Sequence, residues 1–420
     1  MPTDDEHAFF DPIRDAPADD GPRLIYADWL DEHGQSDCAD FIRLQCALDR
    51  LPDDDLRRPD LRERERQLSE AHEARWAADL APLVTDWSFH RGVIDSVSVD
   101  PAQFLASGAA IFELAPIRKV RFLDIGEGLK DLAENPLLRH IRELDLSGNP
   151  LGDRGPMLLA RSPHLAGLHA LDLGFTDLGA TGLKALADAP AFGGLRSLRV
   201  NDNPGLGVVG LRALADSPHL TALIDLDLSG NGLSDAALRP LFDGPLARRL
   251  VRLALQGNHL GDAGTIALVE SLAFTRMAER DGSIDLRRVE MGPTGARALA
   301  ACAALTAVHT LDLEGNTIGD AGLIALAGSP YLTSLRVLAL NENRVSDDGA
   351  RALSRSPLMR TLVRLDLTGN IVTQESQDRL IEASVQHNWR GLLQLKVDTQ
   401  LRARPIGIGP LGIRRRPDAS

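Results

Sequence analysis

A short motif recurs along most of this 420-residue chain at a nearly constant interval. The clearest copies are LDLSGN (144–149 and 226–231), LALQGN (253–258), LDLEGN (311–316), LALNEN (338–343) and LDLTGN (365–370). LRVNDN (198–203) keeps the pattern, while LDLGFT (171–176) and IDLRRV (284–289) replace its last asparagine by Thr176 and Val289. The sixth positions follow one another at 27 residues, with one step of 28 and one of 31. A period of this length is typical of stacked structural units rather than of one compact core.

Each unit has the same internal plan. L-x-L alternates with a period of two, which predicts a short strand, and the asparagine that follows is typical of a turn. Next comes G-D-x-G or a relative, as at 152–155, 261–264 and 319–322, where the aspartate resembles a helix N-cap. A leucine- and alanine-rich helix follows, and Ser-Pro ends it, because proline cannot continue a helix. We therefore expect one strand and one helix in every unit.

Stacking fixes the shape of such an array. Neighbouring strands lie about 5 Å apart, whereas neighbouring helices need about 10 Å. The strands must therefore line the inside of a curve. The sequence predicts an α/β horseshoe, a right-handed solenoid with a concave parallel sheet and a convex layer of helices.

The repeats resemble leucine-rich repeats of the ribonuclease-inhibitor type, which include the Ran GTPase-activating proteins. We assign the solenoid to residues 141–400, with LLQLKVD (392–398) as its last strand. Residues 89–140 hold GVIDSVSVD (92–100), expected to be a capping strand, and RKVRFLDIGEG (118–128), expected to be a shortened unit. FTRMAERDGS (274–283) is interpreted as a loop insertion. Residues 401–420, rich in Pro, Gly and Arg, are predicted to be a disordered basic tail.

Residues 1–88 carry no repeat and are expected to form a separate helical domain. The predicted helices start near Asp19–Pro22 and stop at Gly34, span 36–51 with Ser36 as cap, and span 60–83. PRLIYADWLDEHG followed by ADFIRLQCAL is similar to a repeat-companion domain that precedes repeat arrays in bacterial proteins. FHRGVIDSVSVD resembles the link such proteins use. This resemblance implies an architecture and no activity.

The stretch GPRLIYADWLDEHG (21–34) allows three interpretations. As a catalytic or metal site it is poor, since Asp28 and Glu32 share a helix face while His33 points about 100° away. As packing, Tyr26, Trp29 and Leu30 form a small core. As a docking surface, Tyr26 and Trp29 face a partner.

The concave face holds the candidate partner-binding residues. The middle strand position points out of the sheet, away from the helices, and aspartate is its commonest occupant. These aspartates allow two interpretations. They are structural and bond neighbouring serines or the backbone, or they form an acidic stripe that binds a basic protein. The two interpretations are compatible. The candidates are Asp145, Asp172, Phe175, Arg199, Asp227, Arg252, Asp285, Arg287, Asp312, Glu314 and Asp366, among which Phe175 is the large aromatic residue.

Composition narrows the function classes. The net charge of −14 argues against a general nucleic-acid binder and favours a basic partner. The sequence contains no run of 18 apolar residues, so we expect no membrane span. Its acidic N-terminus lacks the basic and apolar regions of a signal peptide. Cys38, Cys46 and Cys302 match no disulfide or zinc spacing, so we expect a cytoplasmic protein without metal or cofactor. Cys302, in an alanine-rich helix, is interpreted as a packed thiol.

Catalytic motifs such as G-x-S-x-G, H-E-x-x-H or a P-loop do not occur in the sequence. The favoured hypothesis is therefore a non-enzymatic scaffold or adaptor that binds a protein on the concave face. The alternatives are a regulator of an enzyme, by analogy an inhibitor or a GTPase activator, and a small hydrolase or metal site in the N-terminal domain.

Overall fold

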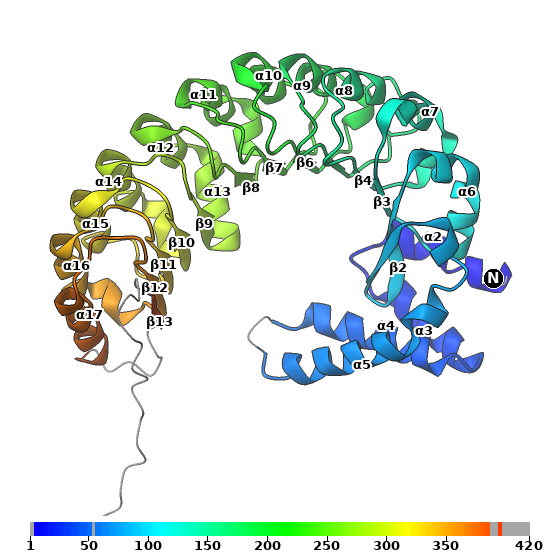
Figure 1. Cartoon of the computed structure of the whole chain (residues 1–420), viewed down its shortest axis with the longest axis horizontal. Coiled ribbons are helices and arrows are strands. Elements are labelled where there is room, and N and C mark those ends of the chain that lie inside the picture. The colour runs from blue at the N-terminus through cyan, green and yellow to red at the C-terminus, as the bar shows by residue number, and fades with distance from the viewer. Residues whose placement is uncertain (1–3, 53–54, 387–393, 397–420) are drawn as a thin grey trace, which may run out of the picture.

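The computed structural model describes residues 4–52, 55–386 and 394–396. The chain forms a curved solenoid with helices on its outer side and strands on its inner side, and a helical module lies at its N-terminal end (Figure 1). This is the predicted α/β horseshoe. The predicted tail at 401–420 lies outside the described residues. None of the described helices is long and apolar enough to cross a membrane.

One short strand per unit lines the inner side. The parallel strands are β2 (Val93–Val99), β3 (Lys119–Phe122), β4 (Glu143–Asp145), β5 (Ala170–Asp172), β6 (Ser197–Arg199), β7 (Asp225–Asp227), β8 (Arg252–Ala254), β9 (Ser283–Asp285), β10 (Thr310–Asp312), β11 (Val337–Ala339), β12 (Arg364–Asp366) and β13 (Gln394–Lys396). They form two sheets, β1 to β8 and β9 to β13. The predicted capping strand is β2, but it is not outermost: β1 (Asp86–His90) pairs with it antiparallel.

The outer layer consists of helices that each contact the next. They are α6 (Pro101–Leu114), α7 (Leu129–Glu134), α8 (Arg154–Leu159), α9 (Ala180–Ala187), α10 (Gly207–Ala215), α11 (Asp235–Asp243), α12 (Gly261–Val269), α14 (Pro293–Ala300), α15 (Gly319–Ala327), α16 (Asp347–Ser354) and α17 (Gln374–Gln386). Many units return to the sheet through a 3-10 turn. These turns are η3 (Pro136–His140), η4 (Pro190–Phe192), η5 (Pro245–Arg248), η6 (Ala303–Ala307) and η7 (Pro357–Arg360). Two other 3-10 turns lie elsewhere: η1 (Ala81–Leu83) precedes β1, and η2 (Gly126–Gly128) lies between β3 and α7. Between strands and helices the leucines of L-x-L pack into one continuous core.

The recurrent asparagine bonds the backbone of two units at once. The Nδ2 of Asn258 donates to the carbonyl oxygens of Leu255 (2.8 Å) and Leu228 (2.9 Å). Its Oδ1 accepts the N–H of Leu233 at 2.9 Å. Asn258 is fully buried, so this one side chain satisfies three backbone groups that water cannot reach.

The G-D-x-G aspartate caps a helix, but not its own as predicted. The Oδ1 of Asp262 accepts the N–H groups of Gly292 (2.8 Å) and Gly295 (2.6 Å) at the start of α14, in the next unit. A Cβ on Gly295 would lie 2.9 Å from this oxygen. The second glycine of the motif therefore makes room for the aspartate of the preceding unit.

The Ser-Pro serine also bonds across a unit boundary. The hydroxyl of Ser162 donates to the carbonyl oxygen of Ala133 at 2.6 Å, and that of Ser329 to Ala300 at 2.6 Å. Cys302 occupies the same position, and its sulfur lies 3.6 Å from the carbonyl oxygen of Val269. Its expected place inside a helix is wrong, since α14 ends at Ala300, but its thiol does pack against the core.

The insertion at 274–283 is a helix, not the predicted loop. Helix α13 (Leu272–Asp281) begins with the hydroxyl of Ser271 accepting the N–H of Phe274, and it ends at Gly282, which has a φ of 58°. It buries Phe274, Met277 and the alanines beside them, and it stands where other units have a 3-10 turn. The sheet is interrupted at this place, between β8 and β9.

In the part of the N-terminal module that the structure describes there are five helices: α1 (Asp4–His7), α2 (Phe10–Asp15), α3 (Gly21–Glu32), α4 (Ser36–Arg50) and α5 (Arg58–Trp76). The predictions for α3 and α4 are confirmed, including the stop at Gly34. Ser36 is the first residue of α4 rather than its cap. The third predicted helix ends early, at Trp76, and α1 and α2 had no counterpart among the predictions.

Candidate functional site

The six candidate aspartates of the concave face all bond their own turn. In each, Oδ1 accepts the backbone N–H two residues ahead, at 2.9 to 3.1 Å. The hydroxyls of Ser147, Ser229 and Thr368 donate to the same oxygen of Asp145, Asp227 and Asp366. The structural interpretation of these aspartates is therefore confirmed.

The aspartates do not form an unbroken acidic stripe. The strand register places Asp145 beside Asp172 and Asp285 beside Asp312. In the other strands a different residue occupies this position. Arg199 lies between Asp172 and Asp227. Ala254 lies beside Asp227, and Ala339 lies between Asp312 and Asp366. The Nη1 of Arg199 is 3.6 Å from the Oδ2 of Asp172. The face is thus a mosaic of both charges.

Two of these carboxyl groups have raised pKa values. Burial is the main cause at Asp172 and at Asp312, and the neighbouring carboxylates Asp145 and Asp285 add to it. The charged form of each is therefore less favourable here than in water.

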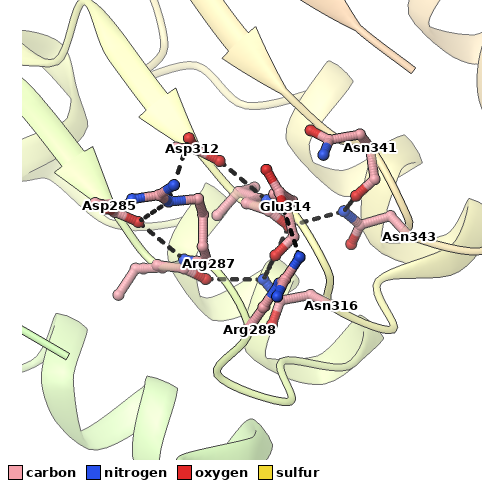
Figure 2. Close-up of polar contacts among 10 residues, drawn as sticks. Asp285, Arg287, Arg288, Asp312, Glu314, Asn316, Asn341 and Asn343 are labelled. Atoms are coloured by element: carbon pink, nitrogen blue, oxygen red, sulfur yellow. Dashed lines mark hydrogen bonds and ion pairs between the residues drawn. The ribbon is translucent and has the colours of Figure 1, made fainter. Parts of the chain in front are cut away.

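A cluster of charged side chains lies over β9 and β10 (Figure 2). The guanidinium of Arg287 donates to both oxygens of Asp285, at 2.9 and 2.7 Å, and its Nε is 3.6 Å from the Oδ2 of Asp312. Arg288, which was not among the predicted residues, pairs with Glu314 at 3.1 Å. The hydrogen bonds that Arg287 donates to Asp285 raise the pKa of Arg287. These candidates are brought together but are paired with one another.

Phe175 stands apart from the charged candidates. Its side chain is 61% exposed, and its backbone has a φ of 56°, which is unfavourable for a bulky residue. Other units place glycine there: Gly148, Gly230, Gly257, Gly315 and Gly369, all at positive φ. Asp202, Arg288 and Glu342 also occupy this position, and each lies over the glycine of the next unit. Arg252, at the start of β8, is exposed as well.

Tyr26 and Trp29 lie in the N-terminal module and differ in exposure. Tyr26 is buried at 8% exposure, and its hydroxyl donates to Glu6 at 2.6 Å. Trp29 is half-buried and stacks on His33, with ring centroids 3.9 Å apart. Packing explains Tyr26 together with Leu30, because both belong to the core of the module. Of the two docking candidates, Trp29 alone presents much surface.

The acids beside Trp29 do not converge on a site. Asp28 pairs with Arg43 at 2.7 Å, and Asp31 pairs with the same arginine at 2.6 Å. The Nδ1 of His33 is 2.7 Å from the carbonyl oxygen of Trp29. Within the described ranges, no three His, Cys, Asp or Glu side chains are grouped as a metal ion requires.

Sequence reasoning missed two features. Arg288 stands at the glycine position of the motif, so aligning the units by their strands would have found it. The second feature is a pocket between the N-terminal module and the solenoid, lined by residues from Glu6 to Pro116. It has no local signal, because those residues are scattered in sequence.

Comparisons with known proteins agree with the repeat architecture. The family model "Leucine Rich repeat" matches residues 138–160, 167–187, 217–242, 248–269, 305–327 and 331–354. No curated protein matches this chain. Among solved structures, a chain in the crystal structure of the Rad7 and Elc1 complex in yeast is similar to this chain, with 16% sequence identity and a TM-score of 0.36. The match covers 88% of this chain and 94% of that chain. A Bacteroides fragilis protein is similar at 15% identity and a TM-score of 0.32, covering 71% and 83%.

Likenesses as distant as these carry no argument about function. The six matched segments coincide with strand-and-helix units of the solenoid. The matched segments are therefore leucine-rich repeats, and they lie along the solenoid of this chain.

Proposed function

We propose that this protein is a scaffold that holds a protein partner against the concave face of its solenoid. The observation that carries this proposal is the exposed Phe175, a bulky aromatic residue at a turn position where five other units have glycine. The turn requires this positive φ in every copy of the motif, but it does not require an exposed aromatic side chain, for which such a φ is unfavourable. Aromatic residues are also frequent anchors of protein interfaces.

The charges around Phe175 suit a partner that brings basic side chains. Asp172 and Asp227 both bond their own turn through Oδ1, so a basic partner would approach them through Oδ2. Arg199 lies between two of these aspartates and adds a place for an acidic group. The partner would thus offer an apolar side chain to Phe175 and basic groups to Asp172 and Asp227.

A substitution at Phe175 separates binding from folding. Phe175→Gly removes the anchor and relieves the positive φ, so we expect a fold at least as stable and a loss of captured partner. Glu342→Gly makes the same backbone change in another unit and is the matched control. Affinity capture from native lysate, quantified by mass spectrometry, measures how much partner each variant retains. Equal recovery of the same proteins by wild type and Phe175→Gly would contradict the proposal.

The proposed attraction between the concave aspartates and a basic partner is tested with a variant that keeps the hydrogen bonds of the turns. Alanine at Asp145, Asp172 and Asp227 would break the turn hydrogen bonds, whereas asparagine keeps an oxygen that accepts the same N–H. We expect the triple Asp→Asn variant to bind the captured partner more weakly and with less dependence on salt. Unchanged affinity and salt dependence would remove the basic partner from the proposal.

The captured partner also decides between scaffold and regulator. If it is an enzyme, its activity with and without this protein shows inhibition, activation or neither. We further propose that the N-terminal module is a companion domain of the bacterial type, and that the protein acts in a reducing cytoplasm. The three cysteines, which form no disulfide, support that compartment.

A further inference from the structure

Strand β1 (Asp86–His90) is an open edge of the larger sheet. It is the first strand in the order β1 to β8, so it has β2 on one side and no described strand on the other. Within the described ranges, the backbone N–H and carbonyl groups of Asp86–His90 form no hydrogen bond outside the ladder with β2. The groups along the outer side of β1 are therefore available to a further strand.

This edge lacks the features by which proteins usually protect an exposed strand, namely proline, lysine, a bulge or very short length. The sequence of β1, DWSFH, contains neither proline nor lysine. Its five residues exceed the three of each strand from β4 to β13. The register shifts between Ser88 and Phe89, but the residue left without a counterpart is Asp95, on β2. The strand that forms the edge is therefore regular and long enough to pair.

The two faces of β1 have different surroundings. Trp87 and Phe89 are half-buried and pack against the core, and the indole N–H of Trp87 donates to Glu73 at 3.2 Å. Asp86 and Ser88 are exposed. A slip of one residue would bring the two aromatic rings to the exposed face, so β1 presents one fixed set of side chains along its edge.

The order of residues in β1 is self-complementary. When two antiparallel copies of the strand are aligned on Ser88, Asp86 of each copy lies opposite His90 of the other, and Trp87 lies opposite Phe89. Opposite-charge pairs and aromatic pairs are cross-strand pairs that stabilise a sheet. Neither Asp86 nor His90 forms an ion pair or a side-chain hydrogen bond with another described residue, and a carboxylate accepts a hydrogen bond from an imidazole N–H.

Other alignments of the two copies lack this match. A parallel pair would bring the two Asp86 carboxylates together, and like charges in that position are destabilising. An antiparallel pair shifted by two residues would place Asp86 opposite Ser88 or beyond the end of the other strand. The alignment on Ser88 is thus favoured by its side chains as well as by its backbone.

We propose that this protein forms a symmetric dimer in which the β1 strands of two copies pair antiparallel, centred on Ser88. The pairing joins the two sheets through their open edges, and a two-fold axis relates the copies. The candidates on the concave face begin at Asp145, on β4, and take no part in this interface. The dimer therefore goes beyond the proposed partner binding, because it carries two concave faces in one particle.

The mass of the full chain in solution tests the dimer. One strand pair is a small interface, so we expect a dissociation constant of about 1–100 µM. In sedimentation equilibrium the mass should rise from one chain toward two across that range of concentration. A mass of one chain at every concentration would overturn the proposal, and the edge would then belong to a strand of a different protein or to none.

Ser88→Lys tests the strand. It places two like charges opposite each other at the centre of the pair, and the exposed position leaves the fold of each copy intact. We expect dimerisation to weaken at least about tenfold. Ser334→Lys, which adds the same charge at an exposed turn of the solenoid, is the matched control and should leave the dimer unchanged. Equal dimerisation of the two variants would overturn the proposal.

A cysteine at the centre of the pair reports its register. Facing residues of antiparallel strands have Cα atoms about 4.5–5.5 Å apart, a separation that a disulfide bridges. We expect Ser88→Cys to give a covalent dimer on mild oxidation, whereas Ser334→Cys and the wild type should stay uncross-linked. A dimer that Ser88→Cys does not cross-link would have its interface elsewhere and would overturn the proposal.

Discussion

Single amide and carboxylate side chains hold the turns of this solenoid together. Asn258 bonds three backbone groups from two units, and Asp312 uses one oxygen for its own turn. A side chain that satisfies several buried backbone groups is costly to remove, because each group left unpaired bears its own desolvation cost.

Asn258→Ala should lower stability by about 2–4 kcal/mol, since it leaves three buried backbone groups without a partner. Asn341→Ala, on the concave face, is the matched control, and we expect a change within about 0.5 kcal/mol. Urea unfolding followed by circular dichroism measures both. Similar midpoint shifts for the two variants would contradict the importance of the buried asparagine.

Asp312→Asn should stabilise the protein at neutral pH. The raised pKa means that the folded state binds the proton more tightly than the unfolded chain does, so the charged form costs stability above the folded pKa. Asparagine removes that charge and keeps the acceptor for the N–H of Glu314. The advantage should fade as the pH falls through the raised pKa of the folded state, and it should be gone below about 3.9, the ordinary aspartate pKa. Urea midpoints measured from pH 7 to pH 3 check this.

Asp347→Asn supplies the control of opposite sign. The backbone N–H of Thr373 leads the groups that lower the pKa of Asp347, so its charged form is favoured in the folded state. We expect this variant to be less stable than wild type at pH 7, with the difference lost as the pH falls through the lowered pKa. The same sign at both positions would argue against burial as the cause at Asp312.

Several outer helices are capped by an aspartate of the preceding unit. Asp320 accepts the N–H groups of Ser346 and Gly349, at 2.7 and 3.0 Å, and thereby caps α16 of the next unit. Because the units are joined in this way, loss of one cap weakens the boundary between two units rather than one helix alone.

Asp320→Ala should cost about 1–2 kcal/mol, the usual effect of losing an N-cap. Asp348→Ala, which removes an exposed acid paired with Arg351, should cost less than about 0.5 kcal/mol. Hydrogen exchange provides a local measurement, and we expect faster exchange at the first turn of α16 in the Asp320 variant. Protection that is unchanged there would refute the capping role.

Helix α13 owes its position to one buried aromatic residue. Phe274 is fully buried, so Phe274→Ala should destabilise the protein by about 3–5 kcal/mol. Leu272, in the first turn of the same helix, is 57% exposed, and Leu272→Ala should change stability by less than about 0.5 kcal/mol. Thermal unfolding compares the two. Equal shifts would mean that α13 is not held by its buried face.

At the scale of the whole molecule, the β1–β2 hairpin joins the N-terminal module to the solenoid. Arg91, at its turn, pairs with the buried Asp20 at 3.0 Å. The N–H of Gly92 donates to Gln45 at 2.6 Å, and Val93 packs in the core of the module. The two parts therefore share a polar contact and a hydrophobic one, which defines their relative position.

Gly92→Ala should disrupt this junction. Gly92 has a φ of 84°, and an added Cβ would lie 2.2 Å from the Cα of Ile42, a backbone atom that cannot move aside cheaply. We expect a cost of about 2–4 kcal/mol from combined strain and overpacking. Gly34→Ala, at a φ of 76° with open space around it, should cost about 1–2 kcal/mol. Limited proteolysis between the module and β2 measures the loosening, which Gly34→Ala should not produce.

The sequence by itself determined the solenoid, its strands, its helices and its curvature, because each follows from a local pattern repeated at fixed spacing. It also contained unused signals for α13: Ser271 as cap, Gly282 as stop, and Ala273, Phe274, Met277 and Ala278 at helical spacing. Only the tertiary structure decided what each polar side chain contacts. Asp262 caps the next helix, Phe175 stays exposed, and residues from Glu6 to Pro116 enclose one pocket. These contacts join segments far apart in sequence, so no periodicity along the chain could reveal them.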